Sequence, residues 1–164
     1  RALVHNPKIL LLDEPTTGLD PQARHSVWDQ IRIFKNNGKT VLLTTHYMDE
    51  AEILCDELAI MDSGKILIRG TPKDLISNIV GSDAIEFVSR SFDKGKKILD
   101  SIEAKSKLKK VSISRVSDRI IVYGEDNEEI VSDFENNPEL TDVIKRRATL
   151  EDVFLKLTGR QLRD

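Results

Sequence analysis

A run of four aliphatic residues ends in two adjacent carboxylates in Ile9-Leu10-Leu11-Leu12-Asp13-Glu14. The run predicts a strand buried on both faces, as in a parallel sheet, because no polar residue alternates with the apolar ones. Asp13 and Glu14 then lie where the strand leaves the sheet, which is the edge where open α/β sheets bind ligands. Neighbouring acids repel each other and resist burial. The pair therefore favours a site that uses a cation and a proton transfer.

A helix and a second buried strand are predicted directly after this segment. Asp20 can cap the helix with Pro21 at its first position, and Asn37-Gly38 can end it. The next strand spans 40–45. His46 follows that strand directly, as the acidic pair follows the first one, so polar groups end both predicted strands.

A short acidic helix and a hairpin complete the first part of the chain. The helix is predicted over 48–54, and its carboxylates Asp49, Glu50 and Glu52 are interpreted as a solvated face. The turn Asp62-Ser63-Gly64-Lys65 is typical of a hairpin. The two strands of the hairpin and the helix after them are predicted over 57–61, 66–68 and 72–79.

The pattern changes around Gly81, so we place a domain boundary within 77–83 and predict an accessory domain over 84–164. Its elements follow the order β-α-β-β-α-β, which is typical of a small α+β ferredoxin-like fold. The predicted elements span, in order, 84–89, 93–103, 108–114, 119–123, 127–136 and 141–146. A last helix follows, with Thr149 and Asp152 as a capping box and Gly159 as its end.

The composition is that of a globular protein with a charged surface, with 39% hydrophobic and 32% charged residues. The net charge of −3 argues against a nucleic-acid partner. The longest apolar run is far too short to span a membrane. Cys55 is the only cysteine, so no internal disulfide can form, which suits a reducing cytosol. No metal-ligand spacing joins the three histidines, and His5 and His25 are expected at the surface.

Three segments in a fixed order resemble parts of an ABC-type ATPase. The segment from Asp13 to Pro21, D-E-P-T-T-G-L-D-P, resembles the Walker B strand followed by the D-loop. Thr44-Thr45-His46 resembles the switch-histidine motif, and 1–7 resembles the end of the helix after the ABC signature. The resemblance covers residues 1 to about 72 and implies that 1–80 are the C-terminal part of a P-loop NTPase parallel-sheet core. In that fold, 9–13 and 40–45 pair in parallel.

The resemblance also implies roles for four residues. Asp13 takes the Walker B role of holding Mg²⁺ beside ATP, and Glu14 takes the role of the general base that activates water. His46 reaches the γ-phosphate and links it to Glu14. Asp20 is the D-loop acid, which crosses the interface between two ATP-binding subunits. A simple helix cap is the alternative for Asp20, and the two roles are compatible.

The family's other motifs do not occur in these 164 residues. No G-x-x-x-x-G-K-[ST] phosphate loop, Gln-loop or L-S-G-G-Q-like signature is present, and the chain begins with Arg1. We therefore expect a C-terminal fragment of a longer subunit that hydrolyses ATP as a whole but is inactive as this piece alone. In the family fold the phosphate-loop strand lies between the strand ending at His46 and the strand at 57–61, so its absence leaves a slot with uncovered backbone groups and apolar side chains. We expect the fragment to fill this slot by self-association, by strand exchange or by rearranging its first half.

The resemblance implies a subunit that drives export through a separate membrane permease. Its tail, residues 148–160, resembles drug-export ATP-binding subunits of the daunorubicin-resistance type. The implied partners are a second ATP-binding subunit, head to tail, and an integral membrane permease. The implied location of the subunit itself is the cytoplasmic face of the cell membrane. An ABC-type ATPase of DNA repair is the alternative, although no sustained heptad appears. A third hypothesis makes 84–164 a regulatory or dimer-stabilising module.

Overall fold

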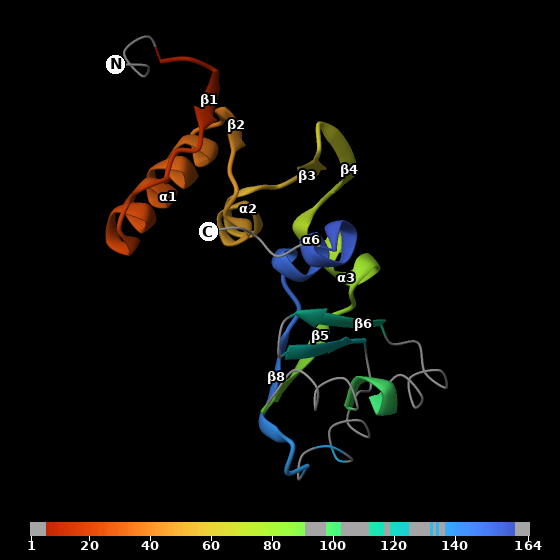
Figure 1. Ribbon diagram of the computed structural model, residues 1–164. Helices are drawn as coiled ribbons and strands as arrows, with labels where there is room; N and C mark the ends of the chain where they lie inside the picture. Colours follow the sequence, from red (N-terminus) through yellow and green to blue (C-terminus); the bar gives the residue numbers. More distant parts are fainter. Residues whose placement is uncertain are drawn as a thin grey trace. The chain divides into compact units, whose positions relative to one another are not determined.

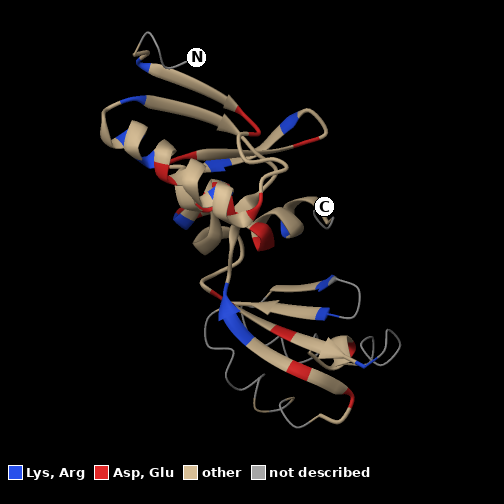
Figure 2. Ribbon diagram, turned by 90° about the vertical axis from the view of Figure 1, so that its left-hand side faces the viewer, with Lys and Arg blue, Asp and Glu red and all other residues tan. Residues whose placement is uncertain are grey.

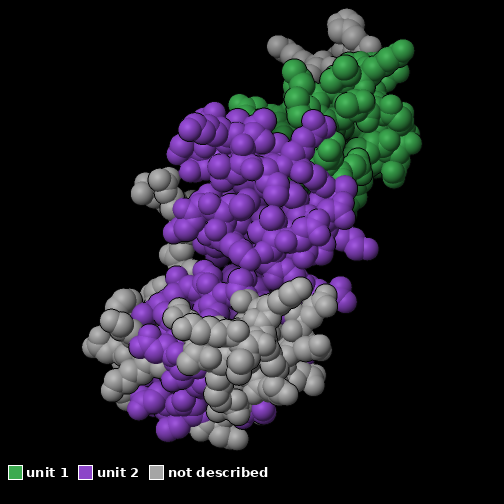
Figure 3. Space-filling view, turned by 90° about the vertical axis from the view of Figure 1, so that its right-hand side faces the viewer, with its two compact units in different colours: residues 1–58 green, residues 59–164 purple. Residues whose placement is uncertain are grey.

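The computed structural model describes residues 6–90, 98–102, 112–116, 119–124, 132, 134 and 137–159. The chain forms two compact units, Arg1–Leu58 and Ala59–Asp164 (Figure 3). The second unit holds the predicted hairpin from Ala59 onward together with the predicted accessory segment. Independent folding of 84–164 remains a prediction. No helix among the described residues is long and apolar enough to cross a membrane.

The first unit is built on a parallel β-α-β arrangement (Figure 1). Strand β1 (Ile9–Asp13) pairs in parallel with β2 (Thr40–Thr44), and helix α1 (Pro21–Asn36) connects them. Helix α2 (Met48–Leu54) follows β2. The predicted parallel pairing is confirmed, and the predicted element bounds agree within a residue or two.

The ends of α1 follow the predicted capping chemistry. Asp20 is the N-cap, and its carboxylate accepts a hydrogen bond from the Ala23 N–H at 2.9 Å, with Pro21 in the first turn. Asn37 is the C-cap, and Gly38 follows with a φ of +75°, a conformation that glycine adopts without strain. These local signals set the length of the helix, and hence the place where β2 begins.

Only one face of the β1–β2 pair is covered, which corrects the prediction that both faces of the strand are buried. Leu10 is buried, whereas Ile9 and Leu11 are 63% and 74% exposed and Leu42 on β2 is 63% exposed. The covered face packs against both helices of the unit. Its core cluster contains Trp28, Ile31 and Leu54, with Leu12, Val27, Val41 and Leu43 packed against it. Within this unit, no described element covers the opposite face.

The second unit begins with the predicted hairpin. Strands β3 (Leu58–Asp62) and β4 (Lys65–Gly70) pair with each other. The two residues between them, Ser63 and Gly64, have φ values of +50° and +73°, the positive values that a two-residue turn of type I′ requires. Helix α3 (Pro72–Ile79) starts at the N-cap Thr71, whose hydroxyl oxygen accepts from the Asp74 N–H.

A four-stranded antiparallel sheet forms the larger part of the second unit. Its strands are β5 (Asp83–Ser89), β6 (Ser112–Val116), β7 (Arg119–Tyr123) and β8 (Leu140–Arg147), arranged in the order β6-β7-β5-β8. The sheet places the first strand between the third and the fourth, as the split β-α-β connections of a ferredoxin-like fold require. The four predicted strands occur in the predicted order, although residues 108–111 of the strand predicted over 108–114 lie outside the described residues.

One face of this sheet carries the main hydrophobic core. Ile85 and Phe87 of β5 pack with Ile120 and Val122 of β7, and Phe87 meets Phe134 edge to face at 5.8 Å between ring centroids. Ile98 and Ile102 also join this core, in the part of the predicted helix 93–103 that is described as helical. Several predictions lie wholly or largely outside the described residues: 1–5, the rest of 93–103, most of 127–136 and the turn at 117–118.

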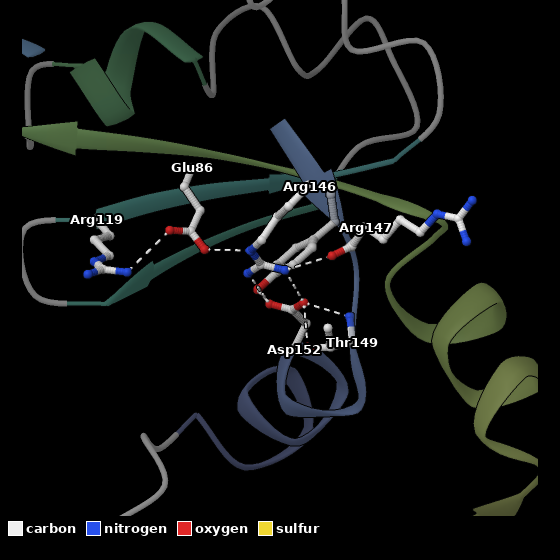
Figure 4. A network of polar contacts seen from close by, with 7 residues as sticks. Glu86, Arg119, Arg146, Arg147, Thr149 and Asp152 are labelled. Carbon is white, nitrogen blue, oxygen red and sulfur yellow. Dashed lines mark hydrogen bonds and ion pairs between the residues drawn. The ribbon is translucent and has the colours of Figure 1, made fainter. Parts of the chain in front are cut away.

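The other face carries a buried polar network that links the sheet to helix α6 (Leu150–Thr158) (Figure 4). Arg146 of β8 donates to Glu86 at 2.6 Å and to both carboxylate oxygens of Asp152 at 2.7 and 2.8 Å. Asp152, which is 1% exposed, also accepts from the Tyr123 hydroxyl and from the Thr149 N–H. The predicted capping box of α6 is confirmed, and Arg146 extends it into the sheet.

The network shifts the pKa of its members in directions that stabilise it. Burial alone would raise the pKa of Asp152, but hydrogen bonds from Arg146, Thr149 and Tyr123 and the charge of Arg146 lower it below the usual value of 3.8. Burial, together with the adjacent Asp152, raises the pKa of Tyr123. Asp152 is therefore ionised in the folded protein at neutral pH.

We predict that this network stabilises the fold down to acid pH. Because the folded pKa of Asp152 is depressed, its contribution is complete above the unfolded value and is lost as pH falls through the folded value. Replacing Arg146 with Met should cost about 3 kcal/mol at neutral pH, since it removes the cation that pairs with the buried Asp152 carboxylate. Urea unfolding at about pH 6 and about pH 2.5 measures both effects.

The variants Asp152→Asn and Asp142→Asn provide the comparison for this prediction. Asp152→Asn should be less stable than the parent at neutral pH and should lose less stability in acid. Asp142 lies exposed on β8, so Asp142→Asn should behave like the parent. Equal acid sensitivity of Asp152→Asn and the parent would contradict the assignment.

We also predict that the isolated 164-residue chain self-associates. The uncovered face of β1 and β2 presents Ile9, Leu11 and Leu42 to solvent as a contiguous apolar surface. Light scattering should give an average mass above that of the monomer that rises with concentration. The double variant Leu11→Lys/Leu42→Lys should lower it, whereas Ile33→Lys on exposed α1 should not. A monodisperse parent monomer would refute the prediction.

Candidate functional site

The polar residues predicted at the two strand ends lie together. Because β1 and β2 are parallel and in register, with Asp13 opposite Thr44, their carboxyl ends meet at one edge. Asp13 closes β1, Glu14 follows it, and His46 lies two residues beyond the end of β2. In Figure 2 the acidic residues at the end of β1 are red.

Glu14 and His46 make direct contact. The Nδ1 atom of His46 lies 2.6 Å from Oε2 of Glu14, and the Thr17 hydroxyl donates to the same oxygen at 2.9 Å. The side chains of Glu14 and His46 are 39% and 47% exposed, so the pair is accessible to a solute. The geometry is that of a carboxylate oriented by two donors at an open edge, as a general base requires.

Asp13 and Glu14 point to different partners because the backbone turns between them. Asp13 accepts a hydrogen bond from the Thr44 hydroxyl, whereas Glu14 reaches His46 and Thr17. Strand alternation does not produce this divergence, because Glu14 is not part of the strand. Glu14 lies beyond the last residue of β1 with a φ of +46°, and its N–H donates to the Thr44 carbonyl.

An aromatic ring packs beside His46, and a guanidinium group packs on that ring. The Tyr47 ring is 4.2 Å from the imidazole centroid, and the Arg24 guanidinium carbon lies 4.4 Å from the Tyr47 ring centroid. Arg24 also approaches Asp49 at 3.6 Å. Helix α1 therefore contributes to the surroundings of the histidine, which the sequence pattern did not indicate.

Asp20 occupies a different position from the other three predicted site residues. It is exposed, and its carboxylate accepts from the Ala23 N–H at the start of α1. The capping alternative for Asp20 is thus confirmed. A role at an interface with a second subunit remains a proposal.

Glu50 corrects the prediction of a solvated acidic face on α2. Asp49 is exposed and Glu52 is half-buried, but Glu50 is 0% exposed. It accepts hydrogen bonds from the Thr16 hydroxyl and the Trp28 indole. Its spacing of four residues from buried Leu54 was the available signal, because residues four apart share a helix face.

The side chains at the strand ends suit a magnesium ion that is bound mainly by water and phosphate, rather than a metal ion that is held by several protein ligands. Within the described residues, no three His, Cys, Asp or Glu side chains converge as a metal site. Asp13 offers one exposed carboxylate. Mg²⁺ keeps several waters and is usually bound by one or two carboxylates plus the phosphates of a substrate, so one such carboxylate suits it.

Two family profiles match the chain. The profile described as the C-terminal domain of the nodulation factor export protein NodI matches residues 98–159, and an AAA-domain profile matches residues 2–48. The "Nod factor export ATP-binding protein I" of Burkholderia orbicola is 42% identical over 164 residues, covering 100% of this chain and 51% of that protein. The protein of the same name from Ralstonia nicotianae is 38% identical, with 100% and 50% covered.

The chain corresponds to the C-terminal part of an ABC transporter ATP-binding subunit. It spans about half the length of the curated relatives it matches. One solved structure, titled "Structure of ATP binding subunit of ABC transporter", is 35% identical with a TM-score of 0.40, covering 44% of this chain and 30% of that one. The names of the curated relatives agree with the ATP-binding subunit that the Walker B, D-loop and switch-histidine motifs implied.

Proposed function

We propose that this part of the ABC subunit supplies the magnesium-binding and water-activating side of an ATP site that drives export. The contact between Glu14 and His46, next to Asp13 at the shared strand edge, carries the proposal. The relatives' names describe ATP-binding proteins of Nod factor export, which favours a transporter over the DNA-repair alternative.

Asp13 would hold Mg²⁺ at the carboxyl end of β1, with the Thr44 hydroxyl orienting its carboxylate. Bound there, the ion would neutralise charge on the phosphates of ATP. The second carboxylate does not compete for that place, because the turn at Glu14 directs its side chain toward His46.

Glu14 would take a proton from the water that attacks the γ-phosphate. Thr17 and His46 both contact its Oε2 atom, and together they limit the orientations that the carboxylate can adopt. The imidazole uses Nδ1 for this contact, which leaves Nε2 facing away from Glu14. Since Nδ1 donates to the carboxylate, Nε2 would donate to a γ-phosphate oxygen in the imidazolium form. One histidine would therefore connect the base to the group being transferred.

Other parts of the subunit and other proteins would supply the rest of the mechanism. We propose that a phosphate loop elsewhere in the subunit binds the β- and γ-phosphates, and that Asp20 faces a second subunit paired head to tail. The subunit would act at the cytoplasmic face of the membrane, and an integral permease would carry the substrate, which is a drug, a lipid or a similar molecule. The resemblance of the tail to daunorubicin-type exporters supports a drug. Residues 84–164 would form an accessory domain beside this ATPase core.

In the complete subunit, we predict that Glu14→Gln lowers kcat for ATP hydrolysis by at least about 100-fold, because the amide keeps the shape and loses the base. ATP affinity should stay within about threefold of the parent, since other groups bind the phosphates. His46→Ala should also lower kcat. Steady-state hydrolysis and equilibrium binding of a fluorescent nucleotide measure the two effects separately.

Matched variants on α1 control for the loss of a carboxylate or an imidazole. Asp29→Asn and His25→Ala remove the same groups from exposed positions and should leave hydrolysis unchanged. Near-normal turnover by Glu14→Gln would exclude Glu14 as the base. An unchanged rate for His46→Ala would remove that residue from the site.

We further predict that the purified 164-residue chain does not hydrolyse ATP. It contains Asp13, Glu14 and His46 but no phosphate-loop motif, so it lacks the main contacts to the β- and γ-phosphates. Phosphate release at millimolar MgATP should equal that of the Glu14→Gln version of the same chain. Magnesium-dependent turnover that Glu14→Gln abolishes would overturn this expectation.

A further inference from the structure

The first unit contains a buried carboxyl group that contacts the turn after Glu14. Glu50 is 0% exposed, and its Oε1 atom accepts from the Thr16 hydroxyl at 2.8 Å and from the Trp28 indole N–H at 2.9 Å. Its Oε2 atom is also buried and has no hydrogen-bond partner among the described residues. The mechanism proposed above does not use this group.

Glu50 lies near His46 along the chain, and its hydrogen-bond partner Thr16 lies near Glu14. Glu50 belongs to α2, which begins two residues after His46, while Thr16 lies two residues after Glu14. Thr16 is itself 0% exposed and sits inside the turn in which the Thr17 N–H donates to the Glu14 carbonyl. The hydrogen bond from Thr16 to Glu50 therefore ties the segment after β1 to the helix after β2.

The energetics indicate that Glu50 does more than fill the core. A buried carboxyl group with one oxygen lacking a partner costs stability, and apolar residues of similar volume often replace such groups at no cost. Trp28 and Leu54 pack in the same cluster, so a leucine in place of Glu50 would extend an existing apolar core. An apolar residue, however, cannot accept the hydrogen bond that the Thr16 hydroxyl donates.

We propose that Glu50 is a positioning residue that keeps Glu14 in contact with His46 by anchoring Thr16. Glu14 has a φ of +46°, which costs energy for a residue with a Cβ, so the turn needs support from outside. Anchoring Thr16 supplies that support from the helix that follows His46. The inference rests on the proposed roles of Glu14 and His46, and it identifies the buried group that sets their separation.

The first test uses the 164-residue chain and needs no activity. Trp28 is the only tryptophan, so its indole N–H gives one resolved signal in a ¹⁵N correlation spectrum. Glu50→Leu should shift that signal and speed hydrogen exchange at the Thr17 amide by about tenfold or more, because the turn opens more often. Glu50→Gln keeps an acceptor oxygen and should retain the protection of Thr17.

Two further variants separate positioning from stability. Thr16→Val breaks the same bond from the other side and should reproduce the exchange effect, even if Glu50→Leu fails to fold. Leu54→Ala removes core volume from the same helix but no hydrogen bond. It should lower the stability of the unit without a selective effect on Thr17. Equal exchange at Thr17 in Thr16→Val and the parent would overturn the proposal.

The second test measures hydrolysis by the complete subunit. Glu50→Leu and Thr16→Val should lower kcat about tenfold or more and leave KM within about threefold, whereas Glu50→Gln and Thr16→Ser should restore most of kcat. A wild-type kcat for Thr16→Val would overturn the positioning role. If Glu14→Gln stays active, the proposed function fails, but the exchange experiment still decides whether Glu50 holds the turn.

Discussion

The in-register parallel pairing of β1 with β2 is the constraint on which the candidate site depends. Parallel strands bring their carboxyl ends to one edge, and the register sets Asp13 opposite Thr44. Glu14 and His46 are 32 residues apart in sequence, yet each lies just past the end of its strand and the two meet at 2.6 Å. A shift of the register by one residue would reverse the faces of the strand and separate these groups.

Both units use a buried polar group to hold the segment that leaves a strand. In the first unit, Glu50 binds Thr16 in the turn after β1. In the second, Arg146 of β8 binds Asp152 of α6, next to the Thr149 cap where the strand gives way to the helix. Apolar packing places helices against sheets, but it does not specify the path of the few residues between them. Directional hydrogen bonds, shielded from water, supply that specification.

Local chemistry made most of the elements predictable. Caps at Asp20 and Thr149, a proline at the first helical position and glycine at the helix end each act over a few residues, so their effect does not depend on the rest of the fold. The hairpin turn at Ser63-Gly64 is local in the same sense. The two strand-end motifs could be found because a run of aliphatic residues followed by polar ones marks the edge of a sheet.

The sequence by itself determined the elements, their order, the parallel pair at the strand edge and the identity of the residues there, because these follow from short-range patterns and motifs. Only the tertiary structure decided which face of β1 is covered, that Glu14 leaves the strand with a positive φ, and that Glu50 is buried while Asp49 is exposed. Each of these depends on what another segment contributes. A carboxylate on a short helix looks solvated in the sequence until the fold brings it the groups that donate hydrogen bonds to it, here the Thr16 hydroxyl and the Trp28 indole N–H.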